Sequence, residues 1–591
     1  MKQFLKFSLA ALALISGLQA VAQVTKPVDP RQIRDVRPDK TSSGTDAATG
    51  SQSSKTPTSS SGGGGSTTFM KEVVKAGNET PINTDLVKKY AESITAEDLE
   101  ALLSFIASDE LEGRETGTRG QKVAARFLAT QFQKMGLKPG NNGKWYQEYK
   151  LRRLSVKSAS ISLTGKDRLE FAKDFISFNK TSLAKSFEAD YVFAGFGIDD
   201  KDYDNLKGLD LKDKVAVVLA GEPKIKDGYV LTNSDQPSDW STSPDMKLKA
   251  LAKKGAKAVL VAFEDEHMAT LVKNPGMKHM MSGSSLTLAY LQEKEPSVPA
   301  FYISETMMNQ LLKKGKTSVE AQRKALSVKA EVGPVDLSKV KFNLTADVVD
   351  EEIVAENVLG MIEGTDKKDE VVILTAHYDH LGVHDGEIFN GADDDGTGTV
   401  ALLEVAEAFM EAVKEGNRPR RTILFMPVSG EEKGLLGSKY YSDHPVFPIQ
   451  KSVCDLNIDM IGRVDEAHKG EPQYIYVIGS DKLSSQLHVA NENANKVVGN
   501  LELDYTFNSP DDPNRFYYRS DHYNFAKHGI PVIFYFSGVH EDYHKSTDDI
   551  EKILFPRAAR VAQLVFATAW DVANRDMKLV VDKSNDFPSN R

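Results

Sequence analysis

Cysteine is almost missing from this sequence. Cys454 is the only one among 591 residues, so no disulfide can form within the chain. A disulfide framework, which supports many small secreted domains, is therefore excluded, and stability must come from core burial and from any bound metal. Cys454 lies in an apolar, strand-like stretch, which indicates a buried small side chain rather than a nucleophile.

Long basic runs and long apolar runs are also scarce. The formal net charge is −10, with 74 Lys and Arg against 84 Asp and Glu. This balance argues against nucleic acid as the main partner. Beyond residue 22 no stretch is long and apolar enough to cross a membrane. The sequence therefore predicts a protein with no stable membrane insertion after removal of any leader.

The amino terminus has the pattern of a signal peptide. Two lysines precede an apolar run at 7–18, which is too short to span a bilayer, and residues 20–22 (Ala-Val-Ala) form a small-x-small cleavage site. Removal of residues 1–22 would leave Gln23 as the first mature residue. We therefore expect an exported protein, periplasmic or extracellular.

The length and composition predict more than one folded unit. A chain of 591 residues with 40% apolar and 27% charged residues is typical of a globular protein of two or three domains. Residues 23–80 are rich in Ser, Thr and Gly and are expected to be a disordered linker. Strand-like and helical stretches alternate from about residue 340, which predicts an α/β fold with a mixed central sheet covered by helices on both faces.

The stretch at 371–398 is the most informative part of the chain. Four apolar residues at 371–374 predict a buried central strand, and His377 and Asp379 follow at its carboxyl end. The two side chains are two positions apart, so an extended backbone points them to the same side. A glycine-rich turn with three consecutive acids follows at 391–398. An acidic turn can simply cap a helix, but imidazole together with carboxylates also suits zinc.

Other predicted strands of this region also end in candidate ligands. These are Glu431 and Glu432 after the strand at 422–428, Asp459 after 454–458, and Tyr543 and His544 in the loop after 531–536. Each residue alone could be a capping acid or a structural histidine. Because ligands gather at the carboxyl ends of strands in α/β sheets, the whole set indicates a shared site.

The chemistry of a two-metal site calls for residues of these types. Two divalent ions roughly 3.5–4 Å apart need a shared carboxylate and about two further ligands each. A neighbouring glutamate that is not a ligand can take a proton from water. Glu431 and Glu432 fit these two roles, and Asp379 is expected to hold the His377 ring in place as a supporting carboxylate.

These motifs resemble the co-catalytic di-zinc aminopeptidases of metallopeptidase family twenty-eight. The family pattern is His-x-Asp, Gly-Ala-x-Asp-Asp, Glu-Glu, Asp-Met and a late His, and all five blocks occur here in order, at 377–379, 391–395, 431–432, 459–460 and 544. The resemblance runs from about 95 to 575 and includes the helical entry at 108–114. Residues 187–315, which lack paired acids with histidine, resemble the protease-associated (PA) domain that many members carry as an insertion.

The resemblance implies the domain order and the role of each site residue. Residues 81–186 and 316–591 would form the catalytic domain of a zinc-dependent exopeptidase fold, interrupted by the insertion at 187–315. The implied ligands of two Zn²⁺ are His377 with Asp459, Glu432 with His544, and Asp394 as the bridge. Glu431 would be the general base, Tyr543 would donate to the oxyanion, and the peptide bond between Asp394 and Asp395 would be cis. The expected function is a secreted aminopeptidase acting on peptides.

Several alternatives remain open at this point. A carboxypeptidase or a glutaminyl cyclase can use the same fold, and some relatives that have lost ligands act as binding proteins. Residues 540–544 also form a literal His-Glu-x-x-His, the motif of single-zinc peptidases when it lies on a helix. Here it follows a strand and a glycine and has no helical apolar stripe, so His540 and Glu541 are expected to be loop residues. The remaining histidines, His380, His384, His522 and His528, are expected to support the structure.

Overall fold

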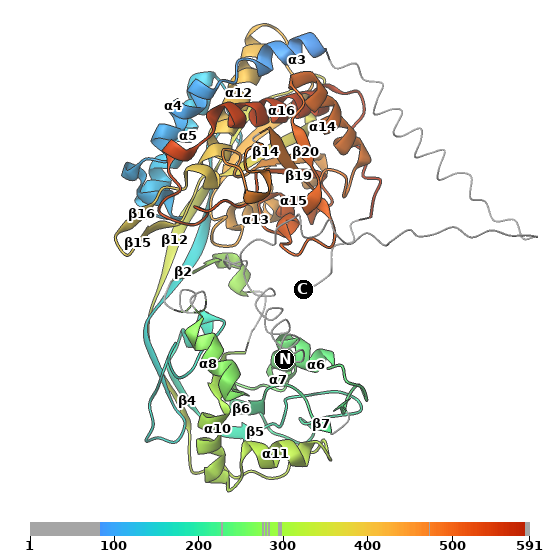
Figure 1. Cartoon of the computed structure of the whole chain (residues 1–591). Coiled ribbons are helices and arrows are strands. Elements are labelled where there is room, and N and C mark those ends of the chain that lie inside the picture. The colour runs from blue at the N-terminus through green and yellow to red at the C-terminus, as the bar shows by residue number, and fades with distance from the viewer. Residues whose placement is uncertain are drawn as a thin grey trace, which may run out of the picture. The chain divides into compact units, whose positions relative to one another are not determined.

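The computed structural model describes residues 83–584 apart from 226–227, 275–276, 278–280, 282–283, 294–297 and 472 (Figure 1). The signal peptide expected at 1–22 and the linker expected at 23–80 lie outside the described residues. The described chain divides into two compact units. One is formed by residues 150–354, and the other by the segments on either side, 83–149 and 355–584.

An eight-stranded mixed sheet forms the centre of the unit made by 83–149 and 355–584. Its strand order is β1-β13-β17-β14-β18-β21-β19-β20. The strands are β1 (Lys138–Pro139), β13 (Gly360–Ile362), β17 (Arg421–Val428), β14 (Lys367–His377), β18 (Ser452–Ile458), β21 (Val532–Phe536), β19 (Tyr474–Ile478) and β20 (Glu502–Asp504). The four strands expected at 371–374, 422–428, 454–458 and 531–536 are present as β14, β17, β18 and β21, with shifts of a few residues at their ends.

Four neighbouring strands of this sheet run in the same direction. β14 pairs in parallel with β17 on one side and with β18 on the other, and β18 pairs in parallel with β21. β14 and β18 are buried along most of their length because both faces of the sheet are covered, which explains their continuous apolar runs. The carboxyl ends of the four strands consequently meet at one edge of the sheet.

Helices cover both faces of the sheet, as the alternation of elements predicted. The helices are α3 (Thr84–Ala91), α4 (Ala96–Ile106), α5 (Arg119–Met135), α12 (Gly398–Lys414), α13 (Leu436–Asp443), α14 (Ser485–Val498), α15 (His522–Ala526) and α16 (Phe555–Asn574). Leu374 of β14 packs in a core with α3, α4, α5, α12, α14 and α16, whereas its neighbour Ile373 packs in a second core with α13 and α15. This alternation follows from the two-residue repeat of a strand.

Local sequence signals mark one end of α4 and one end of α5. Thr95 caps α4 by accepting a hydrogen bond from the backbone N–H of Asp98. α5 ends at Gly136, which takes a left-handed conformation with φ 95° and lets its N–H bond back to the last turn. Among the described residues, no helix combines the length and the apolar character needed to cross a membrane.

The unit of residues 150–354 contains two further main sheets. One has the order β10-β2-β12-β4, with β3 paired to β2, and the other has the order β11-β9-β6-β5. These strands are β2 (Tyr146–Ser162), β3 (Leu169–Glu170), β4 (Phe187–Ala189), β5 (Tyr191–Phe193), β6 (Val215–Leu219), β9 (Ala258–Phe263), β10 (Ser285–Leu288), β11 (Ala300–Ser304) and β12 (Phe342–Val358). Its helices are α6 (Asp239–Thr242), α7 (Pro244–Lys253), α8 (Asp265–Lys273), α10 (Glu305–Leu312) and α11 (Val319–Leu326).

This unit extends further on both sides than the insertion expected at 187–315. The reason is that the long strands β2 and β12 are neighbours in one of its sheets. The segments flanking 187–315 therefore pack with the insertion and share its apolar cores. A sequence pattern shows that a strand exists but not which partner it will pair with, so the boundary could not be placed from the pattern alone.

Candidate metal centre

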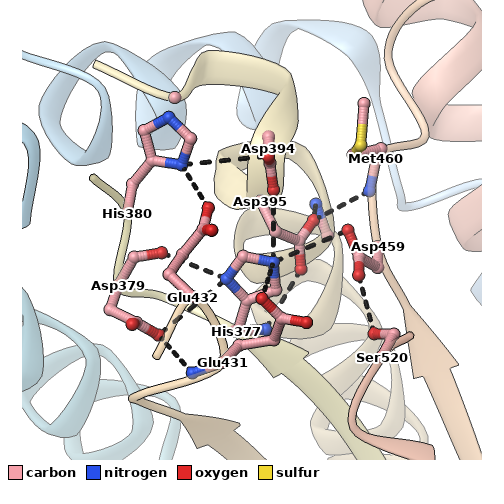
Figure 2. Close-up of polar contacts among 12 residues, drawn as sticks. His377, Asp379, His380, Asp394, Asp395, Glu431, Glu432, Asp459, Met460 and Ser520 are labelled. Carbon is pink, nitrogen blue, oxygen red and sulfur yellow. Dashed lines mark hydrogen bonds and ion pairs between the residues drawn. The ribbon is translucent and has the colours of Figure 1, made fainter. Parts of the chain in front are cut away.

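The candidate site lies at the carboxyl edge of the four parallel strands. β14 ends at His377, β18 is followed directly by Asp459, and the turns after β17 and β21 carry the Glu431–Glu432 pair and His544. Residues far apart in the sequence therefore meet because the parallel pairing aligns the strand ends. Figure 2 shows the side chains of His377, Asp394, Glu431, Glu432 and Asp459 pointing toward one another.

His377 is buried and its ring is fixed in one orientation. The Nδ1–H donates a hydrogen bond of 3.0 Å to the backbone carbonyl of Asp379. This directs Nε2 toward two acids, 3.3 Å from Asp394 Oδ1 and 3.6 Å from Asp459 Oδ1. A histidine held through one nitrogen while the other faces carboxylates has the arrangement of a metal ligand.

Asp394 is the acid of this turn that faces the cluster, whereas its two neighbours accept hydrogen bonds from the backbone. Asp393 Oδ1 accepts the backbone N–H of Gly462, and Asp395 accepts the N–H groups of His377 and Met460. The peptide bond between Asp394 and Asp395 is cis, as the resemblance implied. The two oxygens of Asp394 face different imidazoles: Oδ1 is 3.3 Å from His377 Nε2, and Oδ2 is 3.1 Å from His544 Nε2.

The two adjacent glutamates take different positions. Glu432 lies on the side of His544, with Oε2 3.3 Å from its Nε2. Glu431 lies on the side of His377, with Oε2 4.0 Å from Nε2 of that ring. Burial raises the pKa of Glu431 well above its ordinary value, although the His377 imidazole opposes this shift. The pair thus divides between the two imidazoles, with one glutamate beside each.

Asp379 supports the site in a different way from the one expected. The His377 ring donates to the carbonyl of Asp379, while the carboxylate oxygen Oδ1 stays 3.9 Å from Nδ1. The carboxylate instead accepts a hydrogen bond of 2.6 Å from the Thr116 hydroxyl and one of 3.2 Å from the backbone N–H of Glu431. Asp379 therefore connects the loop of Glu431 to the end of β14.

The charges of the buried groups depend on one another. Burial disfavours the ionised form of Asp394, but hydrogen bonds from His377 and His544 outweigh it and hold its pKa well below the ordinary value. Burial lowers the pKa of His544, but Glu432 and Asp394 overcome this effect and raise it to about 10. Imidazoles that would otherwise be protonated against carboxylates are typical of a site whose natural counter-charge is a metal cation.

The donor set fits zinc. Two groups of donor atoms, each with all atoms within 4.8 Å of one another, share Asp394: His377 with Asp459, and His380 with Glu432. His544 Nε2 approaches the second group through Asp394 and Glu432. Imidazole nitrogens mixed with carboxylate oxygens are the usual ligands of Zn²⁺. The Oδ2 atom of Asp394 and the Oε1 atom of Glu432 are buried and face imidazole nitrogens, His544 Nε2 at 3.1 Å and His380 Nδ1 at 2.9 Å.

A pocket opens beside this cluster and contains the phenol expected to contact substrate. Tyr543 lines it, stacked on the His544 ring with ring centroids 3.9 Å apart, and its hydroxyl accepts a bond of 3.5 Å from Arg519 Nη2. The pocket encloses about 360 Å³, including the part open to solvent, and its apolar wall includes Phe516 and Phe534. Burial raises the pKa of Tyr543 well above its ordinary value, so the phenol keeps its proton.

The His-Glu-x-x-His motif at 540–544 does not form a single-zinc site. Its residues lie in turns rather than on a helix. His540 Nε2 faces Asp393 Oδ2 at 3.3 Å, while His544 Nε2 faces Asp394 and Glu432. The two imidazoles therefore point to different acids and cannot act as the i, i+4 pair of a helical motif.

The other histidines occupy several kinds of environment. His384 Nε2 contacts the Leu381 carbonyl at 2.8 Å. His522 is buried, donates to the Tyr517 carbonyl at 2.8 Å and stacks on Phe534. His528 is exposed on the surface. His380 differs from these three because it lies inside the cluster.

Several residues that support the site had no recognisable local signal. Arg114 is fully buried and donates to the carbonyls of Tyr378 at 2.8 Å and Gly391 at 3.0 Å, which holds the two sides of the site together. Asp548 accepts the N–H groups of Asp393 and Asp394, and Ser520 donates to Asp459 Oδ2 at 2.7 Å. These contacts depend on long-range packing. Only Arg114, within the helical entry at 108–114, belonged to a stretch that the sequence had marked.

Comparison with known proteins agrees with these motifs. Residues 357–569 match peptidase family M28. The chain is 31% identical over 195 residues to a "Glutamate carboxypeptidase 2 homolog" of Caenorhabditis briggsae, covering 32% of this chain and 24% of that protein. It is 27% identical over 232 residues to "Aminopeptidase YwaD" of Bacillus subtilis, covering 38% of this chain and 46% of that protein. The chain thus spans less than half the length of these two relatives.

Solved structures give a broader but more distant match. An aminopeptidase from Aneurinibacillus sp. strain AM-1 aligns over 84% of this chain and 98% of its own, with a TM-score of 0.47 and 18% identity. The five motif blocks lie within or next to the matched segment, and the ends of β14, β17, β18 and β21 bring them to one point. Residues 357–569, which hold all five motif blocks, therefore resemble peptidase family M28.

Proposed function

We propose that the protein is a zinc metallo-exopeptidase, most simply an aminopeptidase that removes amino-terminal residues from peptides. One observation carries this proposal: two groups of buried donor atoms share Asp394, and Glu431 lies beside one of them. The similarity to an aminopeptidase of Bacillus subtilis supports the same activity. His377, Asp394, Glu432, Asp459 and His544 would hold the two Zn²⁺ ions.

The residues around this centre can carry out peptide hydrolysis. Bound zinc supplies Lewis acidity, which polarises a carbonyl group and makes water easier to deprotonate. Glu431 would take the proton from the attacking water and return it to the leaving amine. Tyr543, whose phenol stays protonated, would donate a hydrogen bond to the carbonyl oxygen as negative charge develops on it. Asp379 positions Glu431 by accepting its backbone N–H.

The substitution Glu431→Gln tests the base assignment. It keeps the size of the side chain but removes the carboxylate, so turnover of an aminoacyl reporter should fall by roughly 10²- to 10⁴-fold. Zinc content, measured by elemental analysis, should stay at the level of the unmodified protein. Glu407→Gln, on the exposed side of α12, is the matched control. Normal turnover of Glu431→Gln, or a reaction unaffected by a chelator, would contradict the proposal.

A carboxypeptidase is the second candidate, and Arg519 favours it. Arg519 lines the pocket, lies over the Phe516 ring at 4.9 Å and donates to the Tyr543 hydroxyl. Among the described residues no carboxylate forms an ion pair with it. An arginine of this kind is suited to bind a carboxylate of the substrate. The similarity to glutamate carboxypeptidase homologues is consistent with this reading.

Blocked peptides separate the two candidates. An aminopeptidase should cleave a dipeptide amide with a free amine and leave an N-acetyl dipeptide intact, and a carboxypeptidase should do the reverse. If Arg519 binds the terminal carboxylate, Arg519→Met should lower kcat/KM for the N-acetyl dipeptide about 10- to 100-fold. Arg515→Met, four residues earlier and outside the pocket lining, is the control. Equal loss in both variants would show that Arg519 does not recognise the substrate.

We further propose that the protein is exported and that residues 187–315, within the unit of residues 150–354, form an inserted protease-associated domain. The signal-like residues 1–22 support export, and detection outside the cytoplasm with Gln23 as the first residue tests it. The insertion of a separate unit between the two segments of the catalytic unit supports the domain assignment. Peptides are the partners expected from this reading.

A further inference from the structure

His380 is a buried histidine whose ring faces the acids of the cluster. It follows Asp379 just after β14, and its exposed fraction is 0%. Its Nε2 has no hydrogen-bond partner among the described residues, and its Nδ1 faces acids of the cluster. A buried polar group normally finds such a partner, so this ring needs another explanation.

The ring faces the acids on the His544 side of the cluster. His380 Nδ1 lies 2.9 Å from Glu432 Oε1 and 3.9 Å from Asp394 Oδ2 (Figure 2). His544 Nε2 lies 3.3 Å from Glu432 Oε2 and 3.1 Å from Asp394 Oδ2. Ligand atoms around one tetrahedral zinc, with bonds of about 2.0 Å, are roughly 3.3 Å apart. The contact of His380 with Glu432 and both contacts of His544 are close to that separation, whereas the contact of His380 with Asp394 is longer.

We propose that His380 is a ligand of the metal site formed by Asp394, Glu432 and His544. This rests on the proposed function, because it adds a fourth donor to one of the two sites inferred there. The ring centroids of His380 and His544 are 6.0 Å apart. Two imidazoles that bind one zinc through a nitrogen at about 2.0 Å have centroids roughly 5–6 Å apart, so both rings fit one ion.

The proposal makes the two sites unequal. The site of His377 and Asp459 has three protein donors, including the shared Asp394, whereas the other site has four. Zinc sites with four protein ligands are closed, and sites with three keep a position for water or substrate. Glu431 lies on the His377 side, 4.0 Å from Nε2. The proposal therefore assigns the exchangeable position to the site beside the base, and the tighter binding to the site of His380.

A supporting role for His380 predicts a different set of results. In that role its Nδ1–H would only orient the Glu432 carboxylate and would never touch the ion. Asn has a side-chain amide that reaches about as far as Nδ1, so His380→Asn can keep a donor to Glu432 while offering a poor zinc ligand. His380→Cys has the opposite properties: it is a weak donor but its thiolate binds zinc and cobalt well.

The experiment uses these two variants of the full-length protein after removal of metal and titration with Co²⁺ or Zn²⁺. In His380→Cys, Co²⁺ should produce a new thiolate-to-cobalt charge-transfer absorption. The unmodified protein provides a clean background, because its only cysteine, Cys454, is buried in β18. A thiolate also binds zinc about 0.2–0.3 Å farther out than an imidazole nitrogen, which partly offsets the shorter side chain.

Affinity gives the second measurement. Competition with a chromogenic chelator should show the tighter ion bound roughly 10- to 100-fold more weakly by His380→Asn, with recovery in His380→Cys. The exposed His528→Asn should behave like the unmodified protein, and thermal melts of each variant check the fold. Unchanged affinity in His380→Asn, or Co²⁺ bound by His380→Cys without the new absorption, overturns the proposal. If the unmodified protein binds no metal at all, the proposed function fails as well.

Discussion

At the scale of single residues, the metal centre depends on side chains that are each fixed by a second contact. His377 is oriented by the Asp379 carbonyl, Asp459 by the Ser520 hydroxyl, and Asp394 by the backbone bonds that Asp548 accepts. Such supporting contacts restrict the orientation of a ligand before any metal arrives. The chemistry of the site therefore depends on residues that never touch the substrate.

Asp379 gives a testable example at this scale. Asp379→Ala removes the acceptor for both Thr116 and the Glu431 backbone, so activity on an aminoacyl reporter should fall about 10- to 100-fold. Asp379→Asn should lose less, because an amide can accept from Glu431 and donate to the Thr116 hydroxyl. Steady-state kinetics and zinc content measure both. Equal losses in the two variants would mean that the negative charge matters and the hydrogen bonds do not.

At the scale of elements, α12 is a core helix that carries a buried ionisable side chain. The helix packs against the sheet in a shared core. Most of its side chains are buried, including Glu404, which is 4% exposed. Burial, with Asp98, Glu407 and Glu411 nearby, raises the pKa of Glu404 to about 8. In the unfolded chain the pKa of this carboxyl returns to its ordinary value of 4.5.

This shift predicts how stability depends on pH. Between pH 4.5 and 8 the folded protein binds a proton that the unfolded chain has lost. The stability that this group contributes is complete below pH 4.5 and is lost as the pH rises through 8. The loss is roughly 2 to 4 kcal/mol. Glu404→Gln cannot ionise, so its free energy of unfolding should depend less on pH over this interval.

Urea unfolding at pH 5, 7 and 8.5 measures the effect. The exposed Glu502→Gln is the control, since its carboxylate is in solvent and its loss should change stability by less than about 0.5 kcal/mol. If Glu404→Gln and the unmodified protein lose stability in parallel across this range, the carboxyl of Glu404 is ionised in the folded state and the assignment is wrong.

At the scale of the whole molecule, the two units have separate cores. The cores of residues 150–354 contain no residue of the other unit, and the metal centre lies entirely in the unit of 83–149 and 355–584. Each unit therefore has its own source of stability. A metal that binds only the folded form stabilises the unit that holds it.

Metal removal should reveal this division. Scanning calorimetry is expected to show two transitions, of which a chelator lowers only one. A metal present at 1,000 times its Kd stabilises its unit by about 4 kcal/mol, so the affected transition should move down by roughly 10 °C. Re-addition of Zn²⁺ should restore it. A chelator that shifts both transitions equally, or neither, would contradict the placement of the metal in one unit.

The sequence by itself determined the local features of this protein. The apolar run at 371–374 predicted a buried strand, and the five motif blocks predicted which side chains would meet at one site. These features depend on short-range propensity and on residue chemistry, both of which can be read along the chain.

Only the tertiary structure decided which groups meet. The parallel pairing of β14, β17, β18 and β21 brings the ligands to one edge, the pairing of β2 with β12 moves the boundaries of the second unit to 150 and 354, and packing turns His380 toward Glu432. Contacts of this kind join residues that are distant in the sequence, and their energies depend on the whole packed unit. No local pattern records them, so the role of Arg114, Asp548 and His380 became visible only in the folded chain.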